Sequence, residues 1–419
     1  MRRKRIRAGS GIVAAGLALA VLAPAAPVSA AVNVLPGKPI DIAVDDAHTA
    51  NLQPQAAFDA AGNHVVTWTR WRDDGTQAGI VARLFDAQGN PRSDVFQVNT
   101  YQPSYQQNPV VAMNAAGELA IAWVSYGQDG PGTGIFLQHF RADGSHLGGE
   151  TEVSTPNPGG NTGQVLGIDG AGRVVVAWWN TSGVYLRRFA RNGRPLMPGT
   201  LVESADSPAL AVLADGSFIM AWRTSRAGAG IGVWVQRFDA AAAPVGQAVE
   251  VQTSPIPDRG FPVLAVAPGG GFLVAWDSCD FAHIVFGCQV RARRFSLNFK
   301  PRTAEMQLSP NDFRAHWMPA VAVDRRGNFA VVWDNCRLDS GLQSFDCRVA
   351  ARFLDPQADP GQVTWGVTSD DDLLDVTVAA GGGAFLVGFD TTNCDAAGCN
   401  GKTPTGVYAI PFKVQPQQP

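Results

Sequence analysis

Residues 320–333 read AVAVDRRGNFAVVW and contain the pattern that decides the fold. Two apolar runs, Ala320–Val323 and Phe329–Trp333, flank a polar turn in which Gly327 precedes Asn328. Glycine and asparagine adopt positive φ angles at low cost, so this turn predicts a tight hairpin between two short strands. Both faces of Phe329–Trp333 are apolar, which indicates a strand that other elements cover on both sides.

The same pattern recurs along the chain, with an aromatic residue at the end of each second strand. The intervals are 55, 55, 44, 54, 57 and 56 residues between Trp68, Trp123, Trp178, Trp222, Trp276, Trp333 and Phe389. A third strand ends in phenylalanine in every unit, at Phe85, Phe140, Phe189, Phe238, Phe295, Phe353 and Phe412. A short fourth strand follows a second turn, as in Val95–Val98. The sequence therefore predicts seven units of four antiparallel strands in up-and-down order.

Sheets that need neighbours on both faces predict an all-β fold, a seven-bladed β-propeller. The alternative is a linear β-solenoid, which usually has shorter repeats and capped ends. Unit seven ends at Phe412 with little chain left for a fourth strand, whereas Gly37–Val44 resembles an isolated fourth strand. We expect this N-terminal strand to complete the last blade and close the ring. The propeller is expected to span 31–413 as one domain, followed by a disordered tail at 414–419.

These repeats resemble those of secreted bacterial β-propeller repeat proteins over nearly all of the chain after residue 30. The marks of WD40 repeats are missing, because Trp276-Asp277 and Trp333-Asp334 lie at a different strand end. The Ser-x-Asp-x-Gly-x-x-Trp box of sialidases is also missing. The resemblance implies a fold and says little about function.

Residues 1–30 have the three parts of a secretory signal peptide. A basic start precedes the apolar run Gly11–Leu22, and Val28-Ser29-Ala30 offers small residues for cleavage. An uncleaved anchor is the alternative. Five of the 33 basic residues lie in this segment, so 28 basic and 36 acidic residues remain after it. An acidic secreted chain, extracellular or periplasmic, is a poor partner for nucleic acid, and no membrane span is expected.

The six cysteines lie in pairs at one repeat position, the loop between the second and third strands of units five, six and seven. They are Cys279 and Cys288, Cys336 and Cys347, and Cys394 and Cys399. An even number in a secreted chain predicts three local disulfides that hold these loops. The spacings match no zinc motif.

The loops between second and third strands and those between blades emerge on one face of a propeller, and this face varies most between repeats. Function usually resides on such loops. The candidate ligand-binding residues are Arg70, Trp71, Tyr126, Trp179, Asn180, Arg223, Arg226, His316, Trp317 and Arg337. Flat rings beside charged groups suit a sugar or a peptide. Alternatively, these aromatic side chains plug the mouth of the ring. Because the residues differ between blades, one asymmetric site is favoured over several equivalent ones.

Asp277, Asp334 and Asp390 are the exception, since they occupy one equivalent position in three neighbouring blades. A partial ring of carboxylates suits Ca²⁺, which prefers oxygen ligands. The alternative is that each aspartate caps its strand by accepting backbone hydrogen bonds. No other cofactor is evident.

The main functional prediction is a non-catalytic binding module for an extracellular glycan, peptide or protein. The first alternative is a polysaccharide-active enzyme, a lyase or hydrolase, on the same face. For it, His316 or Tyr126 with a neighbouring arginine are the only candidate acid–base groups, because no catalytic motif is present. The second alternative is a purely structural surface module. The sequence favours no oligomeric state.

Overall fold

The repeated turns form because aspartate side chains tie the backbone of each hairpin. Asp324 Oδ1 accepts hydrogen bonds from the backbone N–H groups of Arg326 and Asn328, both at 2.9 Å. Asn328 Nδ2 donates to the other carboxylate oxygen at 2.7 Å. Gly327 has φ of 85°, the left-handed conformation that glycine adopts without strain. Asp59 and Asn63 make the same contacts in the first unit, so the repeat in sequence is a repeat in structure.

The computed structural model describes residues 34–36, 40–44, 49–72, 78–154, 160–226, 230–253, 260–279, 288–312, 314–338, 345–356, 360–365, 372–381, 383–392, 394–395, 398–399 and 406–414. The strands that belong to the compact unit Ala31–Pro419 group into blades of antiparallel neighbours.

Each blade runs outward from its first strand. Blades one to three contain β3 (Thr49–Phe58), β4 (His64–Arg72), β5 (Gly79–Phe85) and β6 (Phe96–Gln97); β7 (Gln106–Met113), β8 (Leu119–Tyr126), β9 (Thr133–Phe140) and β10 (Thr151–Glu152); and β11 (Thr162–Ile168), β12 (Val174–Asn180), β13 (Gly183–Phe189) and β14 (Thr200–Glu203). Blades four to six contain β15 (Asp206–Val212), β16 (Phe218–Arg226), β17 (Gly230–Phe238) and β18 (Pro244–Glu250); β19 (Pro262–Val266), β20 (Phe272–Ser278), β21 (Gln289–Phe295) and β22 (Met306–Gln307); and β23 (Ala315–Val323), β24 (Phe329–Leu338), β25 (Phe345–Leu354) and β26 (Pro360–Trp365).

The seventh blade joins the two ends of the chain. It contains β27 (Asp372–Gly381), β28 (Ala384–Thr392) and β31 (Gly406–Val414), with the N-terminal strands β1 (Val34–Pro36) and β2 (Ile40–Val44) outermost. Val34 pairs with Val414, and Ile40 pairs with Ala409. The predicted closure of the ring by the N-terminal strand is confirmed. A separate hairpin, β29 (Cys394–Asp395) and β30 (Gly398–Cys399), follows β28.

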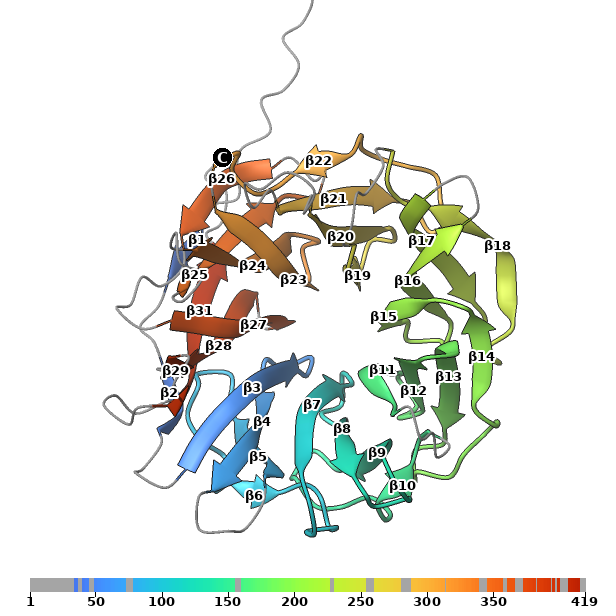
Figure 1. The fold of residues 1–419 in the computed structure, drawn as a ribbon, viewed down its shortest axis with the longest axis vertical. Helices are drawn as coiled ribbons and strands as arrows, with labels where there is room; N and C mark the ends of the chain where they lie inside the picture. The colour runs from blue at the N-terminus through green and yellow to red at the C-terminus, as the bar shows by residue number, and fades with distance from the viewer. Residues whose placement is uncertain are drawn as a thin grey trace, which may run out of the picture. The chain divides into compact units, whose positions relative to one another are not determined.

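The first strand of every blade lies innermost, and each contacts the first strand of the next blade around the ring (Figure 1). The circuit closes where β27 contacts β3. Over the residues that the structure describes, the fold is therefore a seven-bladed, all-β propeller, as the sequence predicts. No helix in this part of the chain has the length and apolar character needed to cross a membrane.

The repeated tryptophans form the core between blades. Trp333 packs against Leu273 and Ala275 of the preceding blade and is fully buried. Burying one tryptophan removes roughly 200 Å² from water, which corresponds to about 5 kcal/mol before entropy is considered. Several indole Nε1 atoms also donate to a side chain on the first strand of the same blade: Trp68 to Asn51, Trp123 to Gln106 and Trp333 to His316. Trp68, Trp123 and Trp333 therefore each fix the innermost strand of their own blade.

Candidate functional site

The candidate residues gather at the end of the ring where second strands end and first strands begin, which we call the loop face. Tyr126 is the last residue of β8, and Trp179 and Asn180 end β12. Trp71 lies near the end of β4, and Trp317 lies near the start of β23. The tight hairpins at Asp59 and Asp324 lie at the opposite strand ends. Antiparallel order thus brings candidate ligand-binding residues from five blades to one face.

The first strands carry a repeated bulge close to the loop face. Gln53, Asn108, Ser207 and Met318 have φ angles of 58°, 55°, 52° and 49°. Strand register shifts at each of these positions. Positive φ is strained for residues other than glycine, and bulges of this kind redirect side chains near binding sites. The sequence signal that we missed is the proline after each of these residues, fourteen positions before the tryptophan.

Hydrogen bonds link these bulges from blade to blade. Gln53 Oε1 accepts from Thr69 Oγ1 at 2.9 Å and from the backbone N–H of Asn108 in the next blade at 3.1 Å. Gln164 Nε2 of the third blade donates to the backbone carbonyl of Asn108. The inner end of the loop face is therefore polar and held in place by neighbouring blades.

An aromatic cluster lies where the first and second blades meet. The ring centroids of Trp71 and Tyr105 are 5.1 Å apart, and those of Tyr105 and Tyr126 are 6.2 Å apart, the latter pair edge to face. Tyr105 is 42% exposed. Gln107 Nε2 lies 3.1 Å from Tyr126 Oη and donates to it. The cluster therefore offers flat apolar surface and a phenolic hydroxyl held by an amide donor.

The third blade presents Trp179 at its loop-face end. A Cβ atom added to Gly163 would collide with Trp179 Nε1, so the indole lies directly across the backbone of the innermost strand. Asn180 Nδ2 donates to Asn161 Oδ1 at 3.1 Å, and Asn180 Oδ1 accepts from the Ser182 N–H at 2.8 Å. Only a residue without a side chain fits beneath Trp179, which fixes the position of this half-buried ring.

An ion pair and an aromatic ring occupy the junction of the fourth and fifth blades. Arg223 Nε and Nη2 each lie 2.7 Å from one carboxylate oxygen of Asp206, the geometry of a bidentate pair. The guanidinium also lies 5.0 Å from the ring centroid of Phe261 in the next blade. The side chains of Arg223 and Asp206 are 22% and 29% exposed, so the pair reaches the surface.

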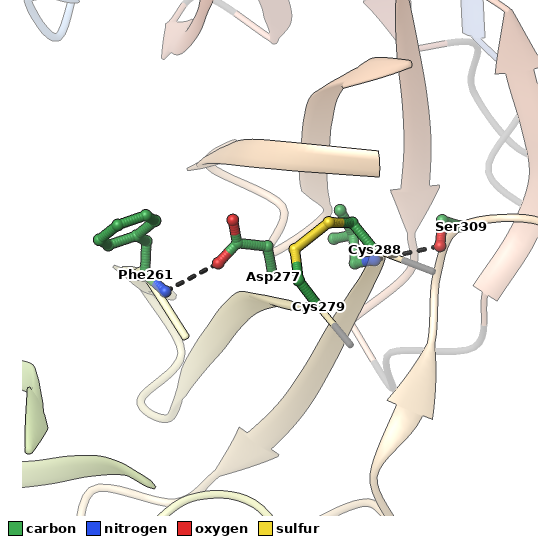
Figure 2. The surroundings of a disulfide bond; sticks show 6 residues. Phe261, Asp277, Cys279, Cys288 and Ser309 are labelled. Carbon is green, nitrogen blue, oxygen red and sulfur yellow. Dashed lines mark hydrogen bonds between the residues drawn. A yellow bond between two sulfur atoms is a disulfide. The ribbon is translucent and has the colours of Figure 1, made fainter. Parts of the chain in front are cut away.

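Asp277 holds the start of the fifth blade. Its Oδ1 accepts a hydrogen bond of 2.8 Å from the backbone N–H of Phe261, and its side chain is fully buried. Figure 2 shows Asp277 directed toward Phe261 and away from the disulfide between Cys279 and Cys288. The bond joins Asp277 at the end of β20 to the residue before β19, so it differs from the local strand-end cap that was the alternative to a calcium ligand.

The rest of the aspartate column is only partly described. Asp334 is also fully buried, and the side chain of Asp390 lies outside the described residues. Within the described parts of the chain, no group of three or more histidine, cysteine, aspartate or glutamate side chains is arranged to hold a metal. The calcium site stays a prediction.

His316 is enclosed where the fifth and sixth blades meet. Its Nδ1 accepts from Trp333 Nε1 at 3.1 Å, its Nε2 lies 2.9 Å from Asp312 Oδ1, and its side chain is 1% exposed. This pattern defines the neutral tautomer with the proton on Nε2. Burial lowers the pKa of His316, and the hydrogen bond to Asp312 opposes part of that effect. His316 thus holds Trp333, and it has little access to a ligand.

The two formed disulfides belong to the fifth and sixth blades, whereas the remaining candidates are spread over several blades. Cys279–Cys288 and Cys336–Cys347 are formed, and Trp317 packs against the first of them. The backbones of Cys394 and Cys399 are paired, but their side chains lie outside the described residues, so the third disulfide stays a prediction. Arg70 contacts Asn51 at 3.5 Å and lies over Trp68. The side chains of Arg226 and Arg337 also lie outside the described residues.

The structure therefore separates the candidates into groups. Trp71 and Tyr126 meet through Tyr105, and Trp179 and Asn180 lie together on the third blade. Arg223 pairs with Asp206, whereas His316 and Trp317 belong to the disulfide region. Sequence reasoning missed four of the neighbours, because they precede or begin the first strands rather than follow the tryptophans: Tyr105, Gln107, Asp206 and Phe261.

Comparison with known proteins gives fold-level similarity. No protein-family model matches the chain, and no curated protein matches it. A Dyadobacter fermentans protein of unknown function has a TM-score of 0.54 at 10% identity, over 91% of this chain and 99% of its own. A polysaccharide lyase, an ulvan lyase bound to -[GlcA(1-4)Rha3S]-, has a TM-score of 0.52 at 10% identity, over 86% and 93%. A Penicillium chrysogenum α-L-arabinanase complexed with arabinobiose has a TM-score of 0.49 at 15% identity, over 90% and 98%.

These similarities change the functional interpretation. They support the resemblance to propellers, but at such low identity they show the fold alone. The main prediction of a non-catalytic binding module was wrong, since a polysaccharide lyase is among the solved structures with a named activity and a TM-score above 0.5. The matches give no support to a peptide or protein partner. They favour the alternative prediction, a polysaccharide-active enzyme.

Proposed function

We propose that this chain is a polysaccharide-active enzyme, and specifically a lyase for a uronate-containing polysaccharide. The observation that carries the proposal is the cluster of Trp71, Tyr105 and Tyr126, in which an exposed aromatic surface adjoins a phenol held by Gln107. Aromatic rings bind the apolar faces of sugars, and a phenol can transfer protons. The ulvan lyase of the same fold was solved with a ligand that contains GlcA.

Three of the described aspartates at the loop face do not suit hydrolysis, which favours elimination. Glycoside hydrolysis usually needs two carboxyl groups that face the substrate. Asp277 and Asp334 are fully buried, and Asp206 is held by Arg223. Elimination instead requires a proton acceptor near a carbon adjacent to the uronate carboxylate. Tyr126 is the group at the loop face that fits this role.

The proposed reaction is a β-elimination. Tyr126, as the phenolate, removes the proton at C5, which is acidified by the neighbouring uronate carboxylate. The electron pair forms the C4–C5 double bond and the C4–O bond breaks. The departing oxygen takes up the proton that Tyr126 removed from C5, which restores the phenolate. Gln107 keeps the Tyr126 oxygen in place through its amide donor. Arg70, which lies over the ring of Trp68, supplies positive charge for the anionic polymer. The charge of Arg223 is balanced by Asp206, so this pair supplies hydrogen-bonding groups instead.

The test is a screen of uronate-containing and neutral polysaccharides with two readouts. New ultraviolet absorbance together with new reducing ends indicates a lyase, whereas reducing ends alone indicate a hydrolase. Tyr126→Phe should lower kcat by at least about a hundredfold, the usual contribution of a positioned acid–base group. Tyr185→Phe is the control, since the Tyr185 ring stacks on Trp178 within the third blade. The proposal is contradicted if no polymer gives either readout, or if Tyr126→Phe keeps full activity.

We also propose that the protein is exported from the cell. A substrate of this size lies outside the cell, and residues 1–30 have the pattern of a secretory signal peptide. The two formed disulfides are typical of proteins in oxidising compartments.

A further inference from the structure

The connections of the loop face are shortest at the third and fourth blades. Two residues, Thr181 and Ser182, join β12 to β13, and two residues, Ser204 and Ala205, join β14 to β15. By contrast, Gly127–Gly132 joins β8 to β9, and eight residues separate β6 from β7. Two residues span at most about 7 Å, so these two connections cannot project far beyond the strand ends. We call this part of the loop face the short-loop sector.

Side chains fix both short connections. Asn180 binds Asn161 and the N–H of Ser182, which closes the first turn. On the second, Glu203 Oε2 accepts from Trp222 Nε1 at 2.8 Å, and the carbonyl of Ser204 accepts from Thr224 Oγ1 at 3.1 Å. The sector is therefore ordered before any ligand arrives, which reduces the entropy cost of binding.

The groups exposed at this sector suit a sugar. Trp179 is half-buried and lies across Gly163, so its ring orientation is set. In the adjacent fourth blade, the Arg223–Asp206 pair offers both a donor and an acceptor at a partly exposed position. An aromatic ring and a bidentate ion pair on neighbouring blades suit a ligand that stacks one sugar face on the ring and hydrogen-bonds hydroxyl groups to the pair.

From these observations we infer that Trp179, with Arg223 and Asp206, forms a second sugar-binding subsite, and that the enzyme cleaves inside polymer chains rather than at their ends. The inference rests on the proposed function. Tyr126 and Trp179 end the second strands of adjacent blades on one face, so a single polymer can contact both. Because the short-loop sector presents no long connection, the polymer can continue past Trp179.

The experiment compares a long polymer with an oligosaccharide too short to reach beyond the Tyr126 cluster. Trp179→Ala should raise KM for the polymer about tenfold and leave KM for the short substrate unchanged. Trp179→Phe should recover most of the affinity for the polymer. Leu201→Ala is the matched control, because Leu201 lies on the outer strand of the same blade and is 49% exposed. Size-exclusion chromatography of early wild-type products should show a broad range of lengths.

Failure of this inference is distinguishable from failure of the proposed function. If the wild type cleaves polymer but Trp179→Ala behaves like Leu201→Ala, or if early products are all of one short length, the inference is overturned and the lyase proposal stands. Retardation of Tyr126→Phe in polysaccharide-containing gels provides a readout without cleavage. The second subsite is excluded if the double variant Tyr126→Phe/Trp179→Ala migrates as slowly in these gels as Tyr126→Phe does. It is also excluded if no polymer retards Tyr126→Phe.

Discussion

Acid should weaken the fold through His139, whose environment allows the size of the effect to be calculated. His139 lies in β9, is 2% exposed, and neither ring nitrogen has a hydrogen-bond partner. Burial lowers its pKa from the ordinary value of 6.5 to about 4, and the charge of Glu118 offsets only part of this. The unfolded chain therefore binds a proton between pH 6.5 and 4 that the folded chain does not bind. Stability contributed by the neutral ring is fully present above pH 6.5 and is lost as the pH falls toward 4.

The magnitude follows from the two pKa values. At 1.36 kcal/mol per unit, the full difference corresponds to about 3 kcal/mol, of which about 2.5 kcal/mol is lost between pH 7.5 and 4.5. Leu84 occupies the equivalent position of the first blade, which makes His139→Leu the natural variant. Urea unfolding at several pH values should show that His139→Leu loses about 2.5 kcal/mol less than the wild type over this range. Parallel stability curves for the two proteins would refute the reasoning.

Two further predictions concern the core and the disulfides. Trp333→Phe should lower the free energy of unfolding by about 2–4 kcal/mol, because it leaves a gap and removes the indole donor to buried His316. Trp276→Phe should cost about 1–2 kcal/mol less, because Trp276 Nε1 has no hydrogen-bond partner among the residues that the structure describes. Equal losses in urea unfolding would show that the indole–histidine bond contributes nothing. The double variant Cys336→Ala/Cys347→Ala should lose about 3 kcal/mol, the chain-entropy value for a loop of 11 residues. Identical urea midpoints for this variant and the wild type would contradict that calculation.

The fold was predictable because its signals are local and repeated. The hairpin of Asp324–Asn328 and the buried strand that ends at Trp333 follow from residue type alone, and the tryptophan interval supplies the number of blades. Ring closure was also predictable, because the last unit lacks a fourth strand that the N-terminus provides. The proline positions carried a signal for the inner bulge, but its left-handed residues became evident only in the structure.

The candidate site was less predictable, because contacts between blades depend on side-chain direction. Alternation along a strand placed Trp71 and Arg223 on the loop face, but their contacts with Tyr105 and Phe261 come from the next blade. For His316, too, the sequence predicts the position along the chain but not the direction of the side chain. Its position near the loop face is correct, yet its ring turns inward to Trp333. Repeats give positions along the chain, whereas chemistry depends on which neighbours each side chain meets.

The pairing of β1 and β2 with β31 has a consequence for biosynthesis. The outermost strands of the seventh blade, β1 and β2, precede all other strands in the chain, and their partner β31 follows all the other blades. Until β31 has been synthesised, the early strands lack this partner. The circle can therefore be completed only after β31 has left the ribosome. Contacts so distant in sequence are expected to form slowly.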